Sequence, residues 1–146
     1  MARSSLRAPT ARDSAGIDAA LLVMRLALGI LILLHGISKL PPPPTFIAAE
    51  LAKMNLPSAL AYGVYLGEIV GPILLIVGVW TRLGALMVVV NMVFAVLLAH
   101  TGDLLKLGEG GGYALELQAM FLFTAIAIAL AGAGRFSVGG RYGPLN

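Results

Sequence analysis

The stretch VYLGEIVGPILLIVGVWTR, residues 64–82, decides the fold class of this chain. Its apolar run is long enough to cross a bilayer, because a hydrocarbon core about 30 Å thick takes roughly 20 helical residues. Glu68 and Pro72 nevertheless stand near its middle. A carboxylate and a residue that cannot donate a backbone hydrogen bond are both costly in lipid. The stretch therefore predicts a membrane helix that carries a polar site.

The composition of the whole chain agrees with this interpretation. Of its 146 residues, 59% are hydrophobic and 12% are charged, whereas a soluble domain carries about a quarter charged residues. The chain has no cysteine, which excludes disulfides, thiol redox chemistry and thiolate metal sites within it. The net charge of +3 lies outside the apolar runs, where it sets orientation in a membrane protein. We therefore expect a lipid bilayer as partner and no nucleic acid.

Four apolar runs predict an all-α, integral membrane four-helix bundle, with spans near residues 19–38, 60–80, 83–99 and 114–132. The first run contains Arg25, but its eleven Leu, Ile and Val residues at about −0.5 kcal/mol each outweigh one Arg at about +3. Pro41–Pro44 should end this span, and a short surface helix with Ile47 and Leu51 on its apolar face follows. The domains are a basic cytoplasmic leader (1–18), the membrane domain (19–138) and a short tail (139–146).

The basic residues predict the orientation of the bundle. With four spans both termini lie on one side, and that side carries six arginines against three lysines in the opposite loops. The positive-inside rule then places both termini in the cytoplasm and the protein in the cytoplasmic (inner) membrane as a multi-pass protein. The arginines are Arg3, Arg7, Arg12, Arg82, Arg135 and Arg141, and the lysines are Lys39, Lys53 and Lys106.

Ionisable and amide side chains inside the spans are the candidate functional residues, because such groups usually face the bundle interior or a cavity. They are Arg25, His35, Glu68, Asn91, His100 and Glu116, with Lys39 at the rim. At about 100° per residue, one narrow arc of the first span holds Arg25, Gly29, Ile32, Gly36 and Lys39. That arc should face inward, and His35 lies off it.

The second span contains the strongest candidate site. Gly63, Gly67 and Gly71 recur every four residues, as in small-residue ridges that allow close helix packing. Pro72 cannot donate to the carbonyl of Glu68, so one turn offers a carboxylate and a freed carbonyl at a predicted kink. We expect Glu68 to pair with Arg25, which lies at a depth about 8 Å different at a rise of about 1.5 Å per residue. The pair is either a structural contact or part of a ligand site.

Glu116 opens the fourth span, where a helix N-terminus alone would explain it. It shares a face with Met120, Phe123 and Ala127, which we expect to point into the bundle. Haem is disfavoured, because His35 lies off the inward face and His100 ends its helix. We predict no metal site.

Several segments together resemble the DoxX family of small membrane proteins, over about residues 20–138. They are LLVMRLALGILILLHGISKL (21–40), GEIVGPILLIVGVWTRLGAL (67–86) and GAGRFS (132–137). Members of this family are four-helix proteins of the cytoplasmic membrane that often bear the label of oxidoreductase subunit. They include a membrane subunit of thiosulfate:quinone oxidoreductase. The resemblance implies a similar redox role here.

Three functions remain open from the sequence. The first, which we favour, is a membrane subunit of a redox complex with a quinone as cofactor and Arg25, Glu68, His35 and Glu116 around it. The second is a scaffold or assembly protein that binds other membrane or redox proteins or a second copy of itself. The third is a small-solute transporter. No residue is assigned a catalytic role.

Overall fold

The computed structural model describes residues 11–40, 44–108 and 110–146. It confirms the predicted all-α class. The helices are α1 (Ala11–Ser38), α2 (Thr45–Lys53), α3 (Gly71–Val77), α4 (Thr81–Ala99) and α5 (Glu116–Ala131), with the short helical segments η1 (Ser58–Gly63), η2 (Leu66–Val70) and η3 (Thr101–Asp103).

Within this described part of the chain, three helical stretches are long and apolar enough to cross a membrane: Ser14–Ser38, Ser58–Val77 and Thr81–Ala99. The fourth predicted span corresponds to α5, which has 16 residues. Helix α1 begins at Ala11, so residues 11–18 of the predicted leader belong to this helix. Residues 1–10 of the leader and Pro41–Pro43 of the predicted stop lie outside the described residues.

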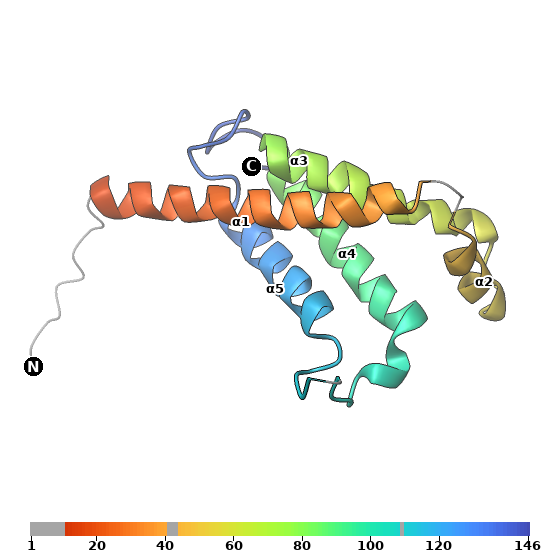
Figure 1. Ribbon diagram of the computed structural model, residues 1–146. Coiled ribbons are helices and arrows are strands. Elements are labelled where there is room, and N and C mark those ends of the chain that lie inside the picture. Colours follow the sequence, from red (N-terminus) through yellow and green to blue (C-terminus); the bar gives the residue numbers. More distant parts are fainter. Residues whose placement is uncertain (1–10, 41–43, 109) are drawn as a thin grey trace, which may run out of the picture.

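The helices pack around one apolar core. α1 lies along η2 and α3, and α4 contacts both α3 and α5 (Figure 1). Helices α1, α3, α4 and α5 all contribute to the core, which consists of Leu28, Ile32, Leu75, Ala85, Val88, Met92, Ala125 and Ile128. The chain end after α5 lies beside the end of α3, whereas α2 lies at the far end of α1 (Figure 1). The molecule therefore has two distinct ends, one formed by the end of α3 with the segment after α5 and the other by α2, and the core lies between them.

Glycines allow α1 to approach the second span closely. Gly29 packs on the Ile76 side chain and the Pro72 carbonyl, and Gly36 packs directly on the Glu68 carbonyl. Arg25, Gly29, Ile32 and Gly36 are buried, so the predicted inward arc of α1 is confirmed. A methyl group at position 36 would overlap the backbone of Glu68.

The second span is not a uniform α-helix. It runs from the 3₁₀ segment η1 through the π-helical segment η2 into α3, and the Gly71 amide donates to the Leu66 carbonyl, five residues back. Pro72 lies in the first turn of α3, where proline needs no donor. Gly67 and Gly71 pack on α4, but a side chain at Gly63 would meet open space. The predicted glycine ridge is therefore formed by two of its three residues.

Candidate functional site

Polar side chains gather at both ends of the core. We name the group formed by Lys39, Glu68 and Asn91, near α2, the Glu68 cluster. We name the group formed by Asp18, Arg25, Arg141 and Asn146, near the end of α3, the Arg25 cluster.

The Glu68 cluster joins three elements through one buried carboxylate. Glu68 is 4% exposed, and the Lys39 ammonium donates to both of its oxygens at 2.6 Å. The Asn91 amide of α4 donates to Oε1 of Glu68 at 3.2 Å. The Tyr65 hydroxyl donates to the Lys39 carbonyl at 3.0 Å and so fixes the chain just after α1. The π-helical turn thus places Glu68 between α1 and α4, and such turns often occur at functional sites.

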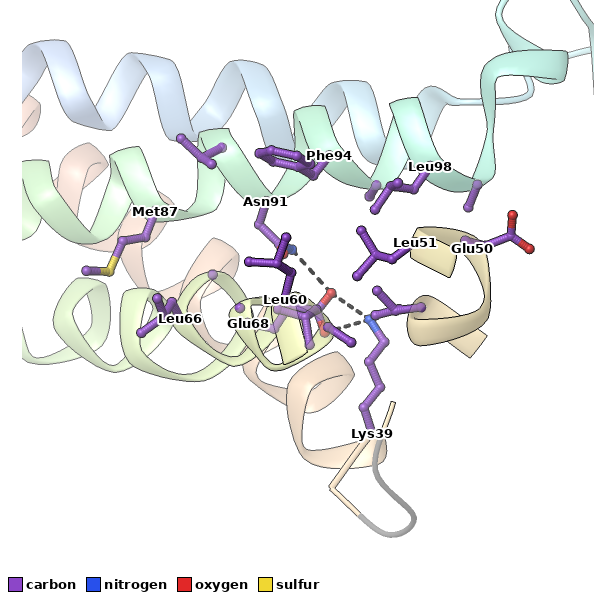
Figure 2. Close-up of a pocket in the computed structure, with 18 of the residues that line it drawn as sticks. Lys39, Glu50, Leu51, Leu60, Leu66, Glu68, Met87, Asn91, Phe94 and Leu98 are labelled. Atoms are coloured by element: carbon purple, nitrogen blue, oxygen red, sulfur yellow. Dashed lines mark hydrogen bonds and ion pairs between the residues drawn. The ribbon is translucent and has the colours of Figure 1, made fainter. Parts of the chain in front are cut away.

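This cluster forms the polar part of the wall of a large cavity. The cavity has a volume of about 650 Å³ and is lined by α2, the second span and α4. Figure 2 shows Glu68 and Asn91 near its centre, with Lys39 reaching the carboxylate from one side. Most of the remaining lining is apolar, including Leu51, Leu60, Leu66, Met87, Phe94 and Leu98. A cavity of this size with few polar groups is typical of sites for small apolar molecules.

The predicted pair of Arg25 and Glu68 is wrong. Arg25 is 1% exposed, and its guanidinium donates to backbone carbonyls: Leu75 at 2.9 Å, Phe136 at 3.1 Å, Ile76 at 3.5 Å, and Ala133. Leu75 and Ile76 lie in the last turn of α3, where carbonyls lack partners within the helix. Arg25 therefore supplies the donors that the end of α3 and the segment after α5 require, and it does not line the cavity.

The segment after α5 completes the Arg25 cluster. Asp18 is 2% exposed and accepts hydrogen bonds from Arg141 at 2.5 and 2.6 Å and from the Arg135 amide at 3.0 Å. Hydrogen bonding to this carboxylate raises the pKa of Arg141 above its ordinary value. The predicted tail is thus held to α1 by an ion pair.

Asn146 connects α3 to α4 at the same end. Its Oδ1 accepts from the Thr81 amide at 3.0 Å, and its Nδ2 donates to the Gly78 carbonyl at 3.2 Å. Gly78 has a positive φ of 76° and lies against Arg25 and Ser137, which leaves no room for a side chain. The turn between α3 and α4 is therefore fixed by residues distant in the sequence.

The other predicted site residues do not converge on Glu68. His35 is exposed, contacts the Leu31 carbonyl through Nδ1 at 2.9 Å and packs edge-on against Phe121. Glu116 is also exposed, at the start of α5, and neither residue lines the cavity. The expected inward stripe of α5 is wrong as well, because Met120 and Phe123 are 66% and 67% exposed. The buried face of α5 carries Ala125 and Ile128 instead.

The sequence contained a signal for one partner that the predicted pairing missed. Lys39 lies on the inward arc of α1 and at the same membrane end as Glu68. Helix face and depth together therefore make Lys39 a better match for Glu68 than Arg25 is. Asp18 and Asn146 carried no comparable signal, since they fall outside the apolar runs and meet their partners only in the folded chain.

Comparisons with known proteins agree with the membrane architecture. The family description DoxX matches residues 20–101, which include Arg25, Lys39, Glu68 and Asn91. A curated protein of Haemophilus influenzae named "Uncharacterized protein" is 33% identical over 104 residues, covering 68% of this chain and 76% of the relative. No solved structure matches the chain significantly. The chain belongs to the DoxX family of membrane proteins.

Proposed function

We propose that this membrane protein is the quinone-binding subunit of a redox complex, with its site at the Glu68 cluster. The observation that carries the proposal is a buried carboxylate, hydrogen-bonded to an ammonium and an amide, in the wall of an apolar cavity of about 650 Å³. A quinone has an apolar ring with two hydrogen-bond acceptors, and this lining matches both properties.

The residues of the cluster have distinct chemical roles in this proposal. Quinone reduction consumes two electrons and two protons, and a partner redox protein supplies the electrons. Lys39 and Asn91 are hydrogen-bond donors for a quinone carbonyl. The Glu68 carboxylate acts as a relay at the cavity wall: it takes up a proton and passes it on to the quinone, as a positioned carboxyl group can. Arg25 keeps the helix ends together and touches no ligand.

Retention of a quinone tests this proposal. The full chain is purified in nanodiscs with decylubiquinone, and the bound quinone is measured by native mass spectrometry. We expect Glu68→Gln to bind about tenfold more weakly, which corresponds to about 1.4 kcal/mol. Glu116→Gln is the matched control, because this carboxylate is exposed and lies outside the cavity. Equal retention by both variants would overturn the proposal.

A cavity-filling variant gives an independent test. Gly63 lines the cavity, and a Cβ there meets no atom within 4 Å. Gly63→Val should therefore exclude the quinone while the protein keeps its thermal stability. Unchanged retention in a folded Gly63→Val protein would place the ligand elsewhere.

The transmembrane topology of the chain is a separate proposal. We infer four membrane crossings, with α5 as the last, and both termini in the cytoplasm of an inner-membrane protein. Arg82, Arg135 and Arg141 lie at the end of α3 and favour that orientation. Because the chain has no cysteine, Lys53→Cys and Val138→Cys each give a single label site. A membrane-impermeant thiol reagent should label only Lys53→Cys from the outside.

An assembly scaffold is the second candidate function. The exposed side chains of Met120, Phe123 and Leu130 form an apolar stripe along α5 that either lipid or a partner helix covers. Failure of every quinone assay, together with loss of complex formation in Phe123→Ala, would favour this function.

A further inference from the structure

We propose that the quinone bound at the Glu68 cluster carries a long apolar tail, and that the tail lies along α4 from Asn91 toward Leu83. This inference rests on the proposed function and adds the class of quinone and its direction of binding. It follows from the shape of the cavity, the distribution of polar groups along it and the depth of the cluster.

The cavity is elongated along one face of α4. Lining residues recur on this helix at spacings of three and four, through Leu83, Met87, Val90, Phe94 and Leu98. Fifteen residues separate the first of these from the last, which is about 22 Å at a rise of about 1.5 Å per residue. Figure 2 shows Met87 and Leu66 on one side of Glu68 and Leu51 and Leu98 on the other. The cavity therefore extends past the polar cluster in both directions.

The two halves of the cavity differ in polarity. On the α2 side, Lys39, Glu50 and His100 contribute to the lining. On the side toward Leu83, the lining residues of α4 are all apolar: Leu83, Leu86, Met87 and Val90. This half is about 12 Å long from Asn91, at a rise of about 1.5 Å per residue. A polar head thus belongs at the cluster, and an apolar tail belongs on the Leu83 side.

Charge and depth favour a neutral head over a phospholipid head group. The Lys39 and Glu68 side chains form an ion pair with no net charge, so they offer no excess positive charge to a phosphate. Asn91 lies eight residues before the end of α4, which is about 12 Å below the end of the helix. A charged group is costly at such a depth. A neutral quinone head pays no such penalty.

Photo-crosslinking of the full chain in nanodiscs tests the tail path. The probe is a dimethoxy-methyl-benzoquinone whose decyl tail ends in a diazirine, and peptide mass spectrometry locates the label. We expect the label on residues 83–90 or on Leu66. An excess of the same benzoquinone without a tail should reduce the labelling at least tenfold, because both compounds compete for the head site.

Two matched variants sharpen this test. Leu86 lines the cavity and is 51% exposed, while Leu97 does not line it and is 52% exposed. Leu86→Trp should reduce labelling severalfold, and Leu97→Trp should leave it unchanged. A variant is compared with the unsubstituted chain only if the two have the same thermal stability and elution volume. If a variant fails to fold, the crosslinked residues identified on the unsubstituted chain still test the tail path.

The outcomes separate the two proposals. Labelling that the tail-free compound suppresses but that maps near α2 or on α1 would overturn the tail path and leave the quinone site in place. Labelling that the tail-free compound does not suppress would overturn the quinone site itself, and the tail path with it.

Discussion

The two ends of this molecule each bury a charged side chain, but they use it differently. At one end, the guanidinium of Arg25 donates to carbonyls of α3 and of the segment after α5, and Gly78 packs against it. At the other end, Glu68 is bonded to Lys39 and Asn91 and borders a cavity of about 650 Å³.

The difference separates a structural charge from a candidate functional charge. An ionisable residue inside a membrane span is by default a functional hypothesis. Here the partners decide between the two roles. Backbone carbonyls at a helix end require a donor to be stable, whereas Glu68 and its two donors form part of the wall of a cavity large enough for a ligand. Experiments that remove one charge at a time can break or sharpen this contrast.

The largest effect is expected for Arg25→Ala. The variant leaves buried carbonyls of Leu75 and Ala133 without a donor, and each such group costs roughly 1–3 kcal/mol. We therefore expect a loss of about 3 kcal/mol or more, measured as a lower Tm in detergent. Arg25→Lys should be intermediate, because it keeps the charge but not the guanidinium geometry. A Tm shift no larger than that of Lys53→Ala would contradict the structural role.

Gly36→Ala should have the next largest effect. Its methyl group overlaps the Glu68 carbonyl, and overpacking typically costs about 1–3 kcal/mol. Gly16→Ala is the control on the same helix, since a Cβ there meets nothing within 4 Å. It should stabilise the protein by roughly 0.5–1 kcal/mol through helix propensity. Equal Tm changes in the two variants would mean that α1 does not pack on Glu68.

Asn146→Ala should destabilise the Arg25 end by about 0.5–2 kcal/mol, because it removes the cap from the first amide of α4. Hydrogen exchange provides a local measurement. The amide of Thr81 should exchange faster in the variant, while amides near Asn91 should be unaffected. An unchanged exchange rate at Thr81 would show that the segment after α5 is not needed to fix this turn.

The smallest effect on stability is expected from exchanging the ion pair of the Glu68 cluster. Glu68→Leu alone leaves the Lys39 ammonium unpaired, whereas the double variant with Lys39→Met removes both charges. The double-mutant cycle should give a coupling of about 0.5–1 kcal/mol, because the Lys39 side chain is 35% exposed. The double variant should fold well and yet bind no quinone. A stable double variant that still binds quinone would show that the charges of Lys39 and Glu68 are not needed for the ligand, and Glu68 would then not differ in role from Arg25.

More of the fold than of the site could be predicted from the sequence: the helices were predicted, but most side-chain partners were not. Apolar run length predicted the long helices, and the helical arc shared by Arg25, Gly29, Ile32 and Gly36 predicted the buried face of α1, because both depend on local periodicity. The inward face of α5 could not be found in this way, since its sequence ELQAMFLFTAIAIALA is apolar on all sides after the first turn. The membrane depth of a residue and the helix face on which it lies limit which side chains can be its partner, but several candidates can remain, as Arg25 and Lys39 did for Glu68. Arg25 bonds to backbone carbonyls, so a search of the sequence for an oppositely charged side-chain partner could not find its partners.

Arg25 also constrains how the protein is made. Its nearest partners in sequence lie 50 and 51 residues later, and the others lie 108 and 111 residues later. At a synthesis rate of about 5–20 residues per second, α1 exists for several seconds before any of those carbonyls has emerged. During that interval the apolar side chains of α1, among them its twelve Leu, Ile and Val residues, hold the charged helix in the bilayer. The hydrophobic excess of α1 therefore serves biogenesis, and the hydrogen bonds of Arg25 form only when later helices arrive.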